Sequence, residues 1–216
     1  MKPIQLFCAA FIYLSGFVAS AQNPLRVEKI PDLKPGDTRE YADRLMTVPC
    51  RQWTTIETNK DGYLVSQCKD LRLYSTADTF NAVKIIRADG TVLVEFKPFS
   101  PSLSFPMYVG KQWSGRYTGI VNNGNGRWFA DFVANGNLRW EGDKRCEVKS
   151  VERLRVAGVL TDAFRIECSE DWKVNFFIQG KAHSTSWYAP GIGLVKGVHS
   201  DNRWDYVLTN YRNQQR

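Results

Sequence analysis

The two histidines of the chain, His183 and His199, are the first candidates for chemistry. Ser184 and Ser186 follow His183, and Asp201 follows His199, so these residues could form a Ser-His-Asp hydrolase. Such triads are defined by geometry, not by sequence spacing. The chain lacks both the G-x-S-x-G turn of serine hydrolases and the H-E-x-x-H zinc pattern. Histidines on strand surfaces are the favoured interpretation, and we predict neither a catalytic residue nor a metal site.

Three carboxylates, Glu167, Glu170 and Asp171, lie beside an expected turn. Paired carboxylates can bind a cation or hydrolyse a glycosidic bond. A solvated loop produces the same pattern and is the favoured interpretation. Because the chain has no G-x-x-x-x-G-K-[ST] phosphate-binding loop, we expect no nucleotide and, more generally, no cofactor.

Aromatic residues are the most suggestive feature for binding, since the chain has 7 Trp and 9 Tyr. Such residues can line a pocket for an apolar or glycan ligand, or can fill a core. Trp187 and Tyr188 differ from the others because Ala189-Pro190-Gly191 must end the strand beside them. We predict Trp187 and Tyr188 as ligand-binding residues at the rim of a site. The alternative is a tight corner that uses the conformational freedom of Gly191.

Four cysteines follow the N-terminal region: Cys50, Cys68, Cys146 and Cys168. An even number in an exported chain indicates disulfides. The midpoint of the first pair falls in the turn sequence Asn59–Gly62, and the midpoint of the second lies beside Gly158. Each pair is therefore predicted to join the two strands of one hairpin, as Cys50–Cys68 and Cys146–Cys168. A four-cysteine zinc site is disfavoured because it needs closely spaced pairs.

Residues 1–21 have the features of a signal peptide. Lys2 precedes an apolar run from Ile4 to Val18, and Ala19-Ser20-Ala21 is an A-x-A cleavage site. The run is shorter than the roughly 20 residues of a membrane-spanning helix. We therefore expect cleavage after Ala21, no transmembrane segment afterwards, and a periplasmic or secreted protein.

The formal net charge is +7, and removal of Lys2 with the signal peptide lowers it by one. A basic protein can bind nucleic acid, an anionic membrane surface or a polyanionic polymer. Because an exported protein seldom meets nucleic acid, we expect an envelope ligand or an envelope protein as partner. The basic residues are scattered along the chain, so a basic surface without a dedicated site is the alternative.

Beyond the N-terminal region the pattern is almost entirely that of short strands separated by Gly, Asn and Asp turns. Residues 37–45 are predicted as either a short helix or a strand. The expected strands are 53–56, 63–65, 83–87, 91–96, 112–121, 127–133, 138–140, 147–156, 163–168, 173–179, 183–188, 194–200 and 204–211. Many short strands with few helical periods predict an all-β antiparallel protein, forming a curved sheet, an open barrel or a sandwich.

Similar short patterns recur along the chain. Val83-Lys84 and Asp89-Gly90 are followed 112 positions later by Val195-Lys196 and Asp201-Asn202. Since a cysteine pair precedes each set, we predict two related halves. The expected organisation is a signal peptide (1–21), an extended lead-in (22–35), a first β half (36–104) and a second β half (105–210). Chance resemblance between two sets of hairpins is the alternative.

Three segments resemble phrases of a known group of proteins. Residues 105–113, FPMYVGKQW, resemble an F-P-L-x-V-G-K-x-W phrase, and residues 156–166 resemble V-x-A-G-x-F-x-A-x-x-I. Residues 187–196, WYAPGIGLVK, resemble W-Y-A-P-G-x-G-x-V-K. Together they resemble an uncharacterised family of exported bacterial β-rich domains of unknown function. The resemblance implies a β-rich secreted or periplasmic domain, without an assigned reaction or catalytic residue.

These observations predict a non-enzymatic, exported envelope protein. We expect it to bind an apolar or polyanionic envelope ligand between its halves. One alternative is a protein–protein adaptor that offers its edge strands to an envelope partner. A further alternative is a hydrolase that uses His183 or His199.

Overall fold

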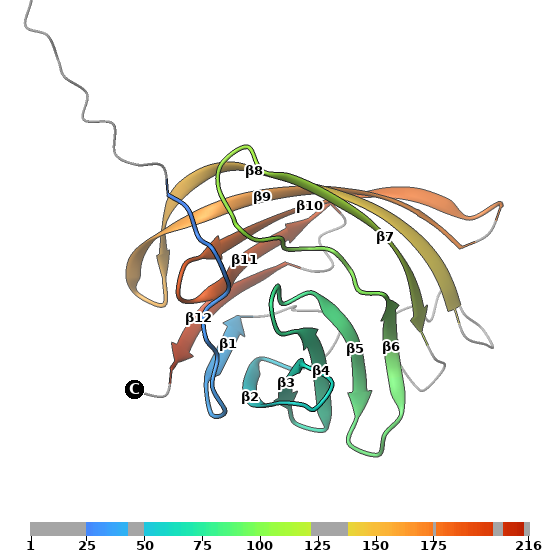
Figure 1. Cartoon of the computed structure of the whole chain (residues 1–216), viewed down its shortest axis with the longest axis horizontal. Helices are drawn as coiled ribbons and strands as arrows, with labels where there is room; N and C mark the ends of the chain where they lie inside the picture. Colours follow the sequence, from blue (N-terminus) through green and yellow to red (C-terminus); the bar gives the residue numbers. More distant parts are fainter. Residues whose placement is uncertain (1–24, 43–49, 122–137, 175, 201–204, 214–216) are drawn as a thin grey trace, which may run out of the picture.

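The computed structural model describes residues 25–42, 50–121, 138–174, 176–200 and 205–213. The described chain forms twelve antiparallel strands that close into one barrel (Figure 1). The strands are β1 (Thr38–Ala42), β2 (Gln52–Thr58), β3 (Tyr63–Cys68), β4 (Leu71–Thr76), β5 (Ala82–Arg87), β6 (Val92–Lys97), β7 (Gln112–Val121), β8 (Leu138–Val156), β9 (Val159–Lys173), β10 (Gln179–Ala189), β11 (Gly193–His199) and β12 (Tyr206–Arg212). The all-β antiparallel prediction is confirmed, and the barrel is the architecture formed.

The order of the strands around the barrel follows the sequence, because each strand pairs with the next one along the chain. The ring closes where β1 pairs with β12 as well as with β2, with Thr38 opposite both Arg212 and Thr54. The long strands β8, β9 and β10 arch over the shorter strands β1 to β6 (Figure 1). Strands β7 to β10 therefore form a broad curved sheet on one side of the molecule.

Both predicted disulfides are present in the structure, Cys50–Cys68 and Cys146–Cys168. Cys146 and Cys168 are directly opposed partners in the β8–β9 pair. The turn of that hairpin lies at Ala157 and Gly158, which both have positive φ. The midpoint argument therefore located this turn correctly.

The segment between β6 and β7, residues 98–111, crosses the inner side of the curved sheet, and we call it the strap (Figure 1). Its Leu103 and Met107 are buried in a cluster with Phe164, Ile166 and other residues of β8, β9 and β10. Met107 also exchanges two backbone hydrogen bonds with Val27 of the lead-in. The strap supplies apolar side chains to the core, which explains why a long connection without a strand is held in place.

Four strand glycines each lie opposite an aromatic residue on the neighbouring strand. The pairs are Gly119 with Trp140, Gly142 with Tyr117, Gly180 with Trp172, and Gly197 with Tyr206. A Cβ added to any of these glycines would lie 2.1–2.6 Å from an atom of the facing ring. The aromatic ring thus covers the glycine backbone and replaces the packing that a side chain would give.

Some predicted elements need correction. Residues 173–179 were expected to form a strand, but Lys173 pairs with Gln179 and Val174 N donates to Ile178 O, so the chain reverses here. The expected turn beside the three carboxylates is also wrong, because β9 continues through them. Residues 138–140 and 147–156 belong to the single strand β8, and β4 had no predicted counterpart.

The uncertain region 37–45 contains the strand β1, and no helix is present there within its described part. The expected strand 127–133 lies outside the described residues, as does the predicted signal peptide 1–21. Strands β1 to β6 lie within the predicted first half, and β7 to β12 lie in the second, except that β12 ends two residues beyond its predicted boundary, at Arg212. Descent of the two halves from a duplication stays a prediction.

Candidate functional site

The two predicted ligand-binding residues project to opposite faces of β10. Tyr188 is fully buried in the core cluster with Phe164 and the strap, and burial raises the pKa of its hydroxyl. Trp187 lies on the other face, where its Nε1 donates to Glu152 Oε2 at 2.8 Å. Lys196 Nζ lies 4.5 Å from the centre of the Trp187 ring. The structure therefore does not bring these two side chains to one rim.

The serines and His183 are separated in the same way. His183 is adjacent to Ser184 in β10, so the two side chains project to opposite faces of the sheet. His199 is the register partner of Ser184 in β11 and shares its face. Asp201, the third member of the possible triad, lies outside the described residues.

The three carboxylates do not converge on one point. Because side chains alternate along β9, Glu167 and Asp171 lie on the face away from the core, and Glu170 lies on the inner face. This arrangement disagrees with a shared cation site or a carboxylate pair. No group of three or more His, Cys, Asp or Glu suited to a metal occurs among the described residues.

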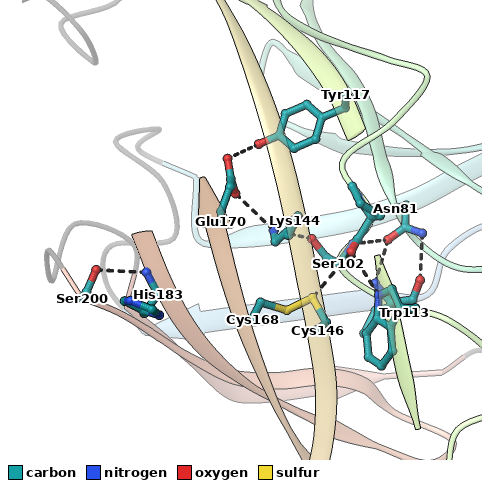
Figure 2. Close-up of polar contacts among 12 residues, drawn as sticks. Asn81, Ser102, Trp113, Tyr117, Lys144, Cys146, Cys168, Glu170, His183 and Ser200 are labelled. Carbon is teal, nitrogen blue, oxygen red and sulfur yellow. Dashed lines mark hydrogen bonds and ion pairs between the residues drawn. A yellow bond between two sulfur atoms is a disulfide. The ribbon is translucent and has the colours of Figure 1, made fainter. Parts of the chain in front are cut away.

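Glu170 belongs to a polar cluster on the inner face, which the sequence did not suggest (Figure 2). Tyr117 OH donates to Glu170 Oε1 at 2.5 Å. Lys144 Nζ lies 3.8 Å from Glu170 Oε2 and donates to Ser102 Oγ of the strap at 3.1 Å. Burial lowers the pKa of Lys144, while the charge of Glu170 opposes that shift. Burial and the same carboxylate raise the pKa of Tyr117.

A serine beside a lysine with a lowered pKa can act as a nucleophile and base. Here, however, the nearby backbone N–H groups are already used, because Ser102 N and Leu103 N both donate to Asn81 Oδ1 at 2.8 Å. They cannot also stabilise an oxyanion. The geometry instead indicates that the inner polar cluster fastens the strap to the sheet.

The opposite face of β7 to β10 is polar and hollowed. Its side chains lie in cross-strand rows, one of which is Arg116–Asp143–Asp171–Lys181. In this row Arg116 forms an ion pair with Asp143 at 3.0 Å, and Lys181 forms one with Asp171 at 3.3 Å. The next rows are Ser114–Arg145–Ser169–His183 and Gln112–Glu147–Glu167–Thr185. Two grooves of about 710 and 590 Å³ follow these rows, and we call this surface the grooved face.

On the grooved face the basic groups are, on average, more exposed than the acidic groups. The basic side chains are 38–87 % exposed, and they are Lys97, Arg116, Arg145, Lys149, Arg165, Lys173 and Lys181. The acidic side chains are 26–57 % exposed, and they are Glu141, Asp143, Glu147, Glu167 and Asp171. The charges alternate in sign and the two ranges overlap, but the most exposed charged groups of this face, Arg116 and Lys181, are basic.

Trp187 lies in the row Arg165–Trp187–Lys196, which follows the row containing Thr185. Its side chain is buried, 9 % exposed, in a second core cluster with Val195 and Leu208, and it lines neither groove. His183 lies within the face and lines the smaller groove. Sequence reasoning missed the face as a whole. A signal was available in β8, where charged residues occur at every second position from Arg139 to Lys149.

Among solved structures, the chain is similar to the hypothetical lipoprotein YmcC from Escherichia coli K12. The TM-score is 0.50 at 9 % identity, over 86 % of this chain and 90 % of that one. The chain shares its fold with YmcC.

Two weaker similarities are to a protein from Bacteroides fragilis described as exported with a YmcC-like fold, and to a protein from Parabacteroides distasonis described as a lipoprotein. Their TM-scores are 0.43 and 0.45, each at 12 % identity. The alignments cover 87 % and 85 % of this chain, and 100 % and 97 % of the other chains. No protein-family model and no curated protein matches the chain.

The two disulfides indicate folding in an oxidising compartment. The described residues contain no helix that is both long and apolar enough to cross a bilayer.

Proposed function

We propose that this protein is an exported envelope protein that binds an extended polyanionic polymer of the envelope along the grooved face. The observation that carries the proposal is that the most exposed charged side chains along two consecutive grooves are basic, with Arg116 87 % and Lys181 77 % exposed. The predicted signal peptide and the two disulfides support an envelope location.

The shape of the grooved face favours an extended ligand. The grooves run across four neighbouring strands, so a polymer with regularly spaced anionic groups can contact several rows in turn. Each exposed ionic contact contributes at most about 1 kcal/mol, so affinity must come from several contacts together. Trp187 lies next to the end of this path, where Lys196 Nζ lies over its ring and Glu152 Oε2 accepts a hydrogen bond from its Nε1. We keep Trp187 as a predicted ligand contact, whereas Tyr188 is fully buried in the core on the other side of the sheet and is not proposed as a contact of this ligand.

Binding of dextran sulfate, with uncharged dextran as reference, tests the proposal. The variant Arg116→Gln/Lys181→Gln removes two of the most exposed basic groups. We expect dextran sulfate to bind the wild type about five- to ten-fold more tightly than this variant at low salt, and the difference to shrink as salt is added.

A charge-matched control removes two lysines from the far side of the barrel. Lys60 and Lys69 are exposed in the β2–β3 and β3–β4 connections. The variant Lys60→Gln/Lys69→Gln loses the same net charge and should bind dextran sulfate within two-fold of the wild type. An equal loss in both variants would mean that only the overall charge matters, and the proposal would be overturned.

The adaptor hypothesis receives less support. Because the strand order closes around the barrel, β1 and β12 are paired with each other and are not free edges. A partner would have to add to the extended hairpins instead.

A further inference from the structure

The reversal between β9 and β10 exposes two adjacent phenylalanines. Phe176 is 96 % and Phe177 94 % exposed, and Ile178 beside them is 38 % exposed. The other described phenylalanines are buried or half-buried. We call Phe176, Phe177 and Ile178 the phenylalanine tip. Such exposure is costly in water, since each ring would otherwise be buried in a core or an interface.

The tip belongs to a hairpin that projects away from the rest of the barrel (Figure 1). Lys173 and Gln179 form the last strand pair below it, and Val174 N donates to Ile178 O at 2.8 Å beyond that pair. Trp172 packs against Gly180 directly beneath the tip and stiffens the hairpin. The two rings are therefore held at the end of an ordered support.

Two basic side chains lie on the hairpin just below the tip. Lys173 and Lys181 are 60 % and 77 % exposed, and each forms an ion pair, with Glu141 and Asp171 respectively. These two lysines lie on the two strands of the hairpin, and Arg116 follows in the same row as Lys181. A surface with an apolar end and a basic collar is complementary to an anionic bilayer, where apolar groups enter the interface and lysines meet headgroups.

We propose that the phenylalanine tip inserts into the interface of an anionic lipid bilayer and holds the barrel against it. The size of the tip favours a bilayer over a protein partner. A stable protein interface needs about 800 Å² from each partner, far more than three side chains supply. A bilayer interface accepts single aromatic rings. The proposal does not depend on polymer binding by the grooved face.

Vesicles provide the test, with full-length protein purified after export from a bacterial host. In vesicles of phosphatidylglycerol and phosphatidylcholine, we expect Phe176→Ser/Phe177→Ser to lower the partition coefficient by about ten-fold or more. The matched control is Val159→Ser/Leu160→Ser. It alters the exposed apolar start of β9, directly after the β8–β9 turn, where Val159 and Leu160 are 55 % and 58 % exposed. This control should stay within two-fold of the wild type.

A second readout reports contact at the tip itself, whatever else attaches the protein to a membrane. Brominated lipid should quench the added fluorescence of Phe176→Trp, and should leave that of Val159→Trp unchanged. Absence of quenching for Phe176→Trp would overturn the proposal. So would concentration-dependent self-association that the serine variant abolishes, because the tip would then bind a second copy of the chain. Unchanged dextran sulfate binding by the serine variant would separate this site from the grooved face.

Discussion

Asn81 holds the backbone of Leu103 from both sides. Its Nδ2 donates to Leu103 O at 2.9 Å, and its Oδ1 accepts from Leu103 N at 2.8 Å. The same Oδ1 also accepts from Ser102 N. Asn81 is only 2 % exposed and follows the β4–β5 turn, so a single buried amide joins that turn to the strap.

Replacement of this amide should destabilise the fold. Asn81→Ala leaves the backbone N–H and C=O of Leu103 without their partner, and each buried unsatisfied group costs about 1–3 kcal/mol. Ser102 N keeps a second acceptor in Ser100 O at 2.9 Å. We expect the free energy of unfolding to fall by about 3 kcal/mol or more in urea denaturation. Gln67→Ala, which removes an exposed amide bonded to Lys69 O, is the control and should cost about 0.5 kcal/mol or less. A similar loss in both variants would contradict this role of Asn81.

Loss of the Cys50–Cys68 disulfide and loss of the Cys146–Cys168 disulfide should lower the free energy of unfolding by amounts similar to each other. The two bridges close loops of 18 and 22 residues, and loops of this size are worth about 3 kcal/mol each in the chain-entropy model. Cys50→Ser/Cys68→Ser and Cys146→Ser/Cys168→Ser should therefore both shift the urea midpoint downwards. Non-reducing peptide mapping of the wild type checks the pairing, and a peptide that joins Cys50 to Cys146 would refute it.

The contact between Gly119 and Trp140 can be tested by a double-mutant cycle. A Cβ on Gly119 would lie 2.1 Å from Trp140 Cζ2, so Gly119→Ala must displace the ring, at a cost of about 1–3 kcal/mol. Trp140→Ala removes the obstacle. We expect Gly119→Ala to lower the free energy of unfolding by less in the Trp140→Ala background than in the wild type. Strict additivity would show that the ring and the glycine do not depend on each other.

Stability should decline in alkaline solution because several tyrosines are buried. Burial raises the pKa of Tyr41 to about 12, and burial also raises the pKa of Tyr117, Tyr188 and Tyr206. An unfolded tyrosine releases its proton near pH 10, whereas the folded ones keep it. The stabilisation is therefore complete below about pH 10 and is lost as the pH rises towards 12.

Tyr41→Phe tests this pH dependence. The variant loses the hydrogen bond to Leu194 O at every pH, but it should also show a shallower decline of unfolding free energy between about pH 10 and 12. Tyrosinate absorbance, followed together with unfolding, checks the assignment. An unchanged slope in Tyr41→Phe would assign the decline to other groups.

The hairpins with clear turn chemistry could be predicted from the sequence. Asn59–Gly62 and Asp89-Gly90 carry residues that tolerate positive φ, and Gly62 and Gly90 have φ of 79° and 88°. The β4 strand was missed because its preceding turn uses Lys69 with φ of 54°, a residue that gives no turn signal. The β9–β10 turn was misjudged because Phe176, Phe177 and Ile178 have strand propensity.

The candidate site was harder to predict than the fold. Glu167, Glu170 and Asp171 are close in sequence, but strand alternation places Glu170 on the other face. The grooved face takes residues from four strands, and it forms only once their register is known. Asn81 and Lys144 both form hydrogen bonds with Ser102 of the strap, which is 21 and 42 positions away from them, respectively. No local sequence pattern indicates such contacts.

The closed strand order has a consequence for how the protein can form. Every strand except β1 can pair with a neighbour that is already made as the chain emerges from N- to C-terminus, so assembly can proceed hairpin by hairpin. The β1–β12 seam, by contrast, joins the first strand to the last. Until β12 arrives, β1 and β11 each present an open edge to other chains. A chain that crosses a membrane unfolded therefore has one vulnerable interval, which ends when this seam closes.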